Sequence, residues 1–180
     1  MPWTLNLQPI RNPWTDEALL TCGRALYIAQ AFEEKCQTLV RYGEMAGMIE
    51  ANPDIKLDDL IAQTPADQLL ARTLARLATL LPGAQGQAET VLTPAREARN
   101  YIAHECTLFA IHSARVTSLH ERMIRLRVEV AKLTAGDNVI STWLYQIAEW
   151  KESTPTFLIA SYPTMIDEWV FGPVLPLLQQ

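Results

Sequence analysis

The chain has 180 residues, which is the size of one ordinary domain and enough to bury a core of its own. Hydrophobic residues make up 49% of the chain and charged residues 19%, a balance that excludes global disorder. The formal net charge of -5 argues against a protein that coats nucleic acid through a uniformly basic surface.

The sequence carries no sign of a membrane segment, a disulfide framework or a bound metal. No apolar run approaches about 18 residues, and the first four residues lack the basic start of a signal peptide. Three widely spaced cysteines, Cys22, Cys36 and Cys106, suit free thiols in a reducing compartment. Cys-x-x-Cys pairs, His-Glu-x-x-His helices and glycine-rich phosphate loops are absent. We therefore expect a cytoplasmic protein with no membrane contact, no metal site and no cofactor.

The chain is predicted to begin with an extended arm followed by one long helix. Residues 1–14 contain three prolines and form the arm, and Thr15 is predicted to cap the helix. The helix runs to about Ala51, because Asn52-Pro53 disfavours helical backbone. Its apolar residues cover more than one side, so we expect this helix to lie deep in a bundle.

A connector and a second helix come next. Residues 53–64 form the connector, with a short helical turn over Leu57–Ala62. The second helix is predicted to begin at Thr64-Pro65, since threonine is a good cap and proline is tolerated in the first turn of a helix. Pro82-Gly83 is predicted to end it.

The third and fourth helices lie in the middle of the chain. The third begins near Ala88 or at Thr93-Pro94 and extends to about Ile111. The fourth covers residues 113–134, and Ala135-Gly136-Asp137 is predicted to end it. Apolar residues recur along the fourth helix in steps of three and four, which is helical spacing: Val116, Leu119, Met123, Leu126, Val130 and Leu133.

A fifth helix and a proline-rich tail complete the prediction. The helix covers residues 138–151. The tail, residues 153–180, contains four prolines and room for one short helix around Thr164–Phe171. We therefore predict an all-α protein, with a single-domain bundle of about five helices over residues 1–180.

Residues 95–105 form the segment with the clearest chemistry. On a helix that turns about 100° per residue, one narrow stripe gathers apolar side chains, namely Ala95, Ala98, Ile102, Cys106 and Phe109. His104 falls on the opposite side, in one row with Arg96 and Asn100. Arg99 lies at the edge of the apolar stripe, where its long side chain can turn outward. A polar row opposite a core stripe faces solvent, a ligand or a partner.

These residue types suit the cleavage of RNA without a metal. Histidine exchanges protons near neutral pH, and arginine presents a permanently charged planar fork to a phosphate. Asparagine can hold a histidine tautomer or bind substrate. We therefore assign Arg99, Asn100 and His104 as candidate catalytic residues. Arg96, Tyr101 and Arg115 are candidate RNA-binding residues, although Tyr101 also suits packing.

The run Arg99-Asn100-Tyr101-Ile102-Ala103-His104 resembles the Arg-Asn-x-x-x-His signature of HEPN domains (higher eukaryote and prokaryote nucleotide-binding). The resemblance implies an all-α bundle and a metal-independent endoribonuclease, commonly a toxin of a toxin–antitoxin or phage-defence system. It also implies a homodimer in which two copies of the motif meet, and a possible antitoxin partner. The subset paired with nucleotidyltransferase-like antitoxins often has tyrosine two positions after the histidine, where this chain has Cys106.

Two other classes of function remain open on the sequence. One is a non-catalytic helical dimerisation or interaction module, such as an inactive HEPN scaffold, and the weaker one is a small-molecule binder in the bundle core. His112 and His120 are expected to be structural. Charge is unevenly spread, because residues 96–132 carry seven of the 15 basic groups against four acidic ones. This leaves room for a basic cleft in an acidic protein.

Overall fold

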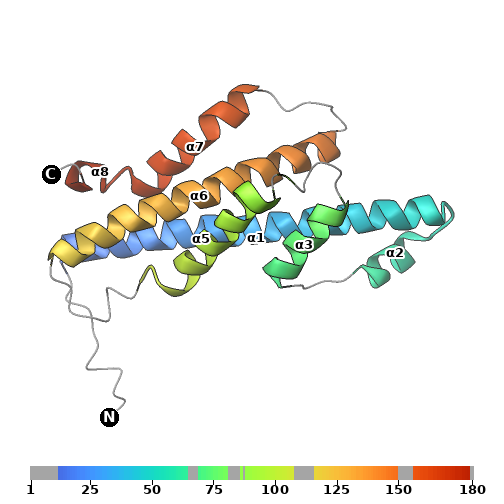
Figure 1. The fold of residues 1–180 in the computed structure, drawn as a ribbon, viewed down its shortest axis with the longest axis horizontal. Helices are drawn as coiled ribbons and strands as arrows, with labels where there is room; N and C mark the ends of the chain where they lie inside the picture. Colours follow the sequence, from blue (N-terminus) through green and yellow to red (C-terminus); the bar gives the residue numbers. More distant parts are fainter. Residues whose placement is uncertain are drawn as a thin grey trace, which may run out of the picture.

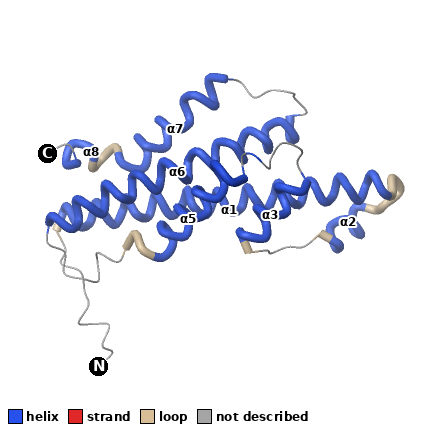
Figure 2. Tube along the Cα trace, in the orientation of Figure 1, coloured by secondary structure: helices blue, strands red, loops and turns tan. Residues whose placement is uncertain are grey.

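The computed structural model describes residues 12–64, 69–80, 86, 88–107, 116–149 and 156–178. These parts are helices joined by turns and loops, and they contain no strand (Figure 2). The predicted all-α class is confirmed. No helix in the described ranges is both long enough and apolar enough to cross a membrane.

Two long helices form the body of the bundle. Helix α1 (Pro13–Ala51) and helix α6 (Val116–Glu149) lie side by side and run in the same direction (Figure 1). Helix α5 (Thr93–His104) packs against both of them, and helix α7 (Thr156–Phe171) packs on α6 and α1. Both α5 and α7 run in the direction opposite to the two long helices (Figure 1). Together with α1 and α6 they form the bundle.

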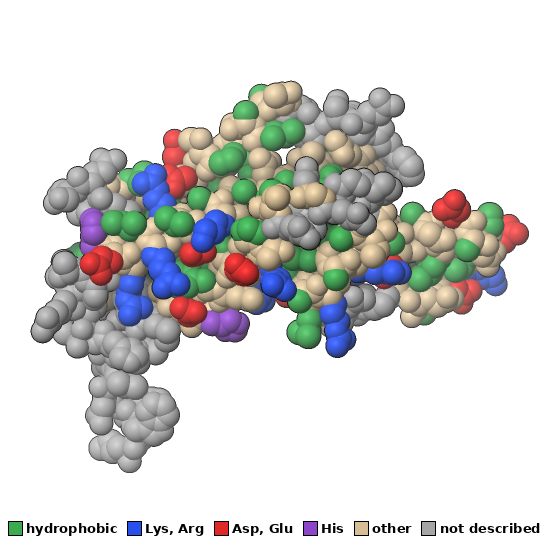
Figure 3. All heavy atoms as spheres, viewed as in Figure 1, with side chains coloured by type: hydrophobic (Ala, Val, Ile, Leu, Met, Phe, Trp, Pro, Cys, Tyr) green, Lys and Arg blue, Asp and Glu red, His purple; other side chains and the backbone are tan. Residues whose placement is uncertain are grey.

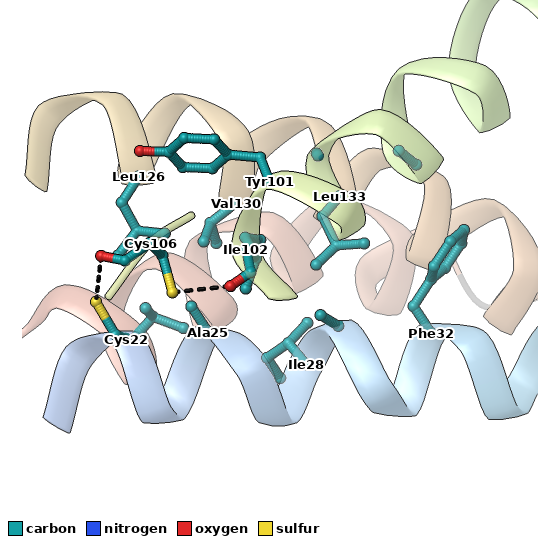
Figure 4. Packing of buried hydrophobic residues seen from close by; sticks show 14 of the residues in the cluster. Cys22, Ala25, Ile28, Phe32, Tyr101, Ile102, Cys106, Leu126, Val130 and Leu133 are labelled. Carbon is teal, nitrogen blue, oxygen red and sulfur yellow. Dashed lines mark hydrogen bonds between the residues drawn. The ribbon is translucent and has the colours of Figure 1, made fainter. Parts of the chain in front are cut away.

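The core lies where α1, α5 and α6 meet (Figure 4). Ala25 and Phe32 point from α1 into the space below α5 and α6, into which Ile102 and Leu133 also point, and all four side chains are buried. The core stripe predicted on α6 is confirmed for the five members whose burial the structure describes: Leu119, Met123, Leu126, Val130 and Leu133.

The N-terminus of α1 differs from its prediction. The helix begins at Pro13, and Asn12 is the capping residue, because its side-chain oxygen accepts a hydrogen bond from the Thr15 amide at 2.9 Å. Asparagine is a stronger cap than threonine, and proline fits the first position of a helix, so the cap moves three residues upstream. The prediction that Thr15 caps the helix is wrong, and the remainder of the predicted arm, residues 1–11, lies outside the described residues.

The connector after α1 contains helix α2 (Leu57–Gln63), which confirms the predicted helical turn. Helix α3 (Leu70–Leu80) follows and packs against α1. Its predicted start at Thr64-Pro65 is not tested, because residues 65–68 lie outside the described part of the chain. Thr64 itself ends α2, and its hydroxyl donates to the Leu60 carbonyl at 2.7 Å.

Helix α5 is shorter than predicted. A π-helical turn over Ala88–Leu92 precedes it, and the α-helix runs from Thr93 to His104. The prediction that it extends to about Ile111 is wrong, since residues 105–107 form a turn. The amide of Glu105 closes the last turn on the Tyr101 carbonyl at 2.8 Å. His104 therefore lies in the last turn of α5.

The predicted break at residues 135–137 does not exist, because α6 is one continuous helix of 34 residues. A Cβ atom added to Gly136 would lie 2.3 Å from the Cβ of Ala95 on α5. Gly136 thus serves close helix packing and does not end a helix. The fourth and fifth helices of the prediction are two halves of α6.

The C-terminal region is more helical than predicted. Helix α7 covers Thr156–Phe171 with Pro163 inside it, and α8 covers Leu175–Leu178. Proline lacks the amide that would bond the carbonyl four residues earlier, which belongs to Ile159. The side-chain amide of Asn138 on α6 donates to that carbonyl at 2.9 Å. A neighbouring helix therefore supplies the missing donor, and the short helix predicted around Thr164–Phe171 is the second half of α7.

Candidate active site

Arg99 lies where α5 packs against α1. One terminal nitrogen of its guanidinium, Nη2, donates to the Glu33 carboxylate on α1, and the other, Nη1, donates to the Asn100 side-chain oxygen at 3.2 Å. The side chains of Arg99 and Glu33 are 24% and 23% exposed. The guanidinium is thus held from two sides and is partly open to solvent.

Asn100 and His104 are exposed, one helical turn apart on α5. On the other side of the helix, the predicted core stripe is confirmed for its described members: Ala95, Ala98, Ile102 and Cys106. The helix therefore separates a buried apolar side from an exposed polar row, as its periodicity predicts. Phe109 lies outside the described residues.

The end of α5 is attached to α1 by two cysteines (Figure 4). The thiol of Cys22 donates to the Cys106 carbonyl at 3.4 Å, and the thiol of Cys106 donates to the Ile102 carbonyl at 2.8 Å. The interaction with Cys106, together with burial, raises the pKa of Cys22. Both thiols are buried and free, and their bonds help to fix the turn that follows His104.

Arg96 is half-buried on the same helix. Its Nε atom is buried and makes no hydrogen bond within the described part of the protein. A buried donor without a partner is costly, and an acceptor outside the protein can reach this N–H only if the neighbouring side chains move. Arg96 stays a candidate binding residue through the positive charge of its half-buried side chain.

Tyr101 points toward α6, away from the polar row (Figure 4). It is buried, and the guanidinium of Arg125 lies 4.4 Å from the centre of its ring. Burial raises the pKa of Tyr101, and the charge of Arg125 partly opposes that shift. Because Arg125 already covers the ring, Tyr101 packs between helices, and stacking on a nucleic-acid base would require this contact to open.

The structure does not describe every residue that the sequence singles out. Arg115 and His112 lie outside the described residues, and His120 is half-buried on α6. Sequence reasoning missed Glu33, which lies 66 residues before Arg99, and the contact of Arg125 with Tyr101. No local pattern links such distant positions. Basic side chains gather over α5 and the adjacent part of α6, with acidic side chains between them (Figure 3).

A separate open groove of about 540 Å³ lies between α6 and α7. Its walls include Ile124 and Val128, which are half-exposed, together with Pro163. Arg127 and Asp167 join across it through two hydrogen bonds of 2.8 and 2.6 Å, and this interaction raises the pKa of Arg127. No residue of the polar row on α5 lines the groove.

No family model, no curated protein and no solved structure matches this chain. Within the described ranges, no three histidine, cysteine or acidic side chains are grouped so that they could hold a metal ion. The assignment of function therefore depends on the residues of α5 and their contacts. These place a held arginine at the edge of the buried side of one short helix, and an exposed asparagine and histidine on its outer side.

Proposed function

We propose that this protein is a metal-independent endoribonuclease of the HEPN type, with a role in toxin–antitoxin or phage-defence systems. The observation that carries the proposal is the environment of the motif on α5. Arg99 is held by Glu33 and Asn100, while Asn100 and His104 are exposed to an incoming strand. The ion pair alone would also suit a structural contact between two helices, and the exposed Asn100 and His104 beside it are what favour catalysis.

The reaction is the attack of a ribose 2′-hydroxyl on the adjacent phosphorus. The 2′-oxygen–phosphorus bond forms and the bond from phosphorus to the 5′-oxygen breaks, which leaves a 2′,3′-cyclic phosphate and a 5′-hydroxyl. His104 accepts the proton of the 2′-hydroxyl, and Arg99 stabilises the charge that develops on the phosphate oxygens. Asn100 orients the arginine, and the positive charge of Arg96 attracts a neighbouring phosphate.

The departing 5′-oxygen needs a proton from a second acid. One chain carries one copy of the motif, so a homodimer supplies that acid as His104 of the second copy. The two α5 helices then face each other across the RNA. In this arrangement, the basic side chains of α5 and α6 guide the phosphate backbone.

The test is cleavage of a labelled RNA in EDTA by the wild type and by the variants His104→Ala and Arg99→Ala. We expect each variant to lose at least about 100-fold in kcat/KM, the usual minimum contribution of general acid–base catalysis. His120→Ala is the matched control, because His120 lies on α6 outside the motif, and it should stay within about twofold. Mass spectrometry should identify a 2′,3′-cyclic phosphate.

Equal activity in the wild type and all three variants would exclude this mechanism, and so would complete loss of activity with EDTA alone.

The second candidate function is a non-catalytic interaction module, and the apolar groove between α6 and α7 favours it. That function predicts a stable dimer or complex in analytical ultracentrifugation, with no RNA cleavage at high protein concentration and no effect of His104→Ala.

A further inference from the structure

We infer that Glu33 is a positioning residue for Arg99. It raises the turnover of the proposed ribonuclease and weakens the binding of the RNA substrate. This inference rests on the proposed ribonuclease function. Glu33 belongs to α1, far from the motif in sequence, and it reaches Arg99 where α1 packs on α5.

The hydrogen bonds of Arg99 leave part of the guanidinium available. A guanidinium has five N–H groups, of which two belong to each terminal nitrogen. Glu33 takes one N–H on Nη2, and Asn100 takes one on Nη1. No described residue takes the other N–H on either terminal nitrogen or the N–H on Nε, so these three remain for a phosphate. Glu33 fixes the plane of the guanidinium without using up its donors.

Holding the arginine in place has a catalytic benefit. A free arginine side chain samples many rotamers and must lose that freedom when it binds the transition state. The ion pair fixes Arg99 before the substrate arrives, and both partners are only about a quarter exposed, so solvent competes weakly for it. Loss of the carboxylate therefore lowers turnover.

The same carboxylate opposes the binding of RNA. Its negative charge lies beside the group that receives the phosphate, and the two anions repel each other at close range. Removal of the charge should strengthen ground-state binding while it weakens transition-state stabilisation. A residue that only joins α1 to α5 would not lower kcat and KM together.

The experiment compares Glu33→Gln with Glu34→Gln, which removes the same charge from the next, exposed position of α1. For Glu33→Gln we expect kcat to fall about tenfold and KM to fall about twofold, and for Glu34→Gln we expect wild-type values within about 1.5-fold. In an Arg99→Ala background, Glu33→Gln should have no further effect on kcat, because its action passes through Arg99.

A second measurement does not depend on activity. The side-chain NMR signals of Arg99, assigned by their loss in Arg99→Ala, should show slow rotation of the guanidinium in the wild type and in Glu34→Gln. Rotation should become fast in Glu33→Gln. If the wild type cleaves RNA through His104 and Glu33→Gln behaves as Glu34→Gln does, the role of Glu33 is refuted and the proposed function stands. If the wild type shows no cleavage that depends on His104, the proposed function fails and the role of Glu33 fails with it, even where NMR finds Arg99 held.

Discussion

The thiol of Cys36 lies buried on α1, among side chains that oppose its ionisation. Burial raises the pKa of this thiol most, and the carboxylates of Asp137 and Glu33 raise it further, while Lys35 lowers it. At the residue scale, a titratable group in such surroundings links folding to pH, because the folded and unfolded chains bind the proton with different strength.

The pH dependence of stability follows from the sign of that shift. In the unfolded chain the pKa of a cysteine is about 8.5, whereas in the folded protein the pKa of Cys36 is raised and the thiol keeps its proton to a higher pH. Its contribution to stability is therefore fully present below about pH 8.5 and is lost as the pH rises toward the folded pKa. The free energy of unfolding, measured with urea, should fall between about pH 8.5 and about pH 10. In Cys36→Ala this fall should be shallower by up to about 1.4 kcal/mol per pH unit. Parallel declines in the two proteins would contradict this prediction.

At the scale of the elements, α5 packs closely against α6 because Gly136 of α6 has no side chain. The run Ala135-Gly136-Asp137 is typical of the end of a helix, and only the presence of Ala95 across the interface explains why Gly136 lies in the middle of one. Ala95 belongs to α5, the helix that also carries the motif Arg99–His104. Packing and candidate chemistry are therefore linked through α5.

Substitution of glycine by alanine should have opposite effects at two positions. Gly136→Ala forces the new Cβ against Ala95, so we expect unfolding to become easier by about 1–3 kcal/mol. Gly23 lies inside α1 with open space around it, so Gly23→Ala should be neutral or stabilise the protein by up to about 1 kcal/mol. Chemical denaturation of both variants checks the pair. A destabilised Gly23→Ala with an unchanged Gly136→Ala would reverse the assignment.

At the scale of the whole molecule, one polar cluster joins the three longest helices. The Lys35 amine on α1 donates to both carboxylate oxygens of Asp137 on α6, at 2.9 and 2.8 Å, and to Ser141 at 3.0 Å. The phenol of Tyr162 on α7 donates to the same carboxylate, whose charge adds to burial in raising the pKa of Tyr162. Asp137 is 1% exposed, so its charge depends on these partners.

Removal of this buried charge should destabilise the fold far more than removal of a similar charge at the surface. Asp137→Asn leaves the Lys35 amine, 32% exposed, without its counter-charge, and we expect a loss of about 3 kcal/mol. Asp167→Asn is the matched control, because Asp167 also joins α6 to α7 but its pair with Arg127 is 33–43% exposed. That change should cost at most about 1 kcal/mol in the same unfolding measurement. Equal losses would show that the cluster does not hold the bundle together.

The local pattern of the sequence is enough to predict the helices, their core stripes and the exposed polar row around His104. The reason is that helical periodicity depends only on neighbours three and four residues apart. The same rule placed Cys106 in the core stripe and kept Asn100 out of it. Ends of helices were predicted less well, as Asn12 and His104 show, because capping and turn residues compete over a few positions.

Contacts between distant segments were decided only by the tertiary structure. Gly136 remains helical because α5 packs against it, and Pro163 remains helical because Asn138 on α6 donates to the carbonyl that proline leaves free. The partner of Arg99 belongs to α1 for the same reason. Within a single segment, a glycine or a proline predicts a break in a helix, and an arginine predicts a charge without a partner. A neighbouring helix changes each of these predictions, because it fills the space beside the glycine, supplies a donor near the proline or supplies a carboxylate to the arginine. No pattern within one segment shows which helix that neighbour is.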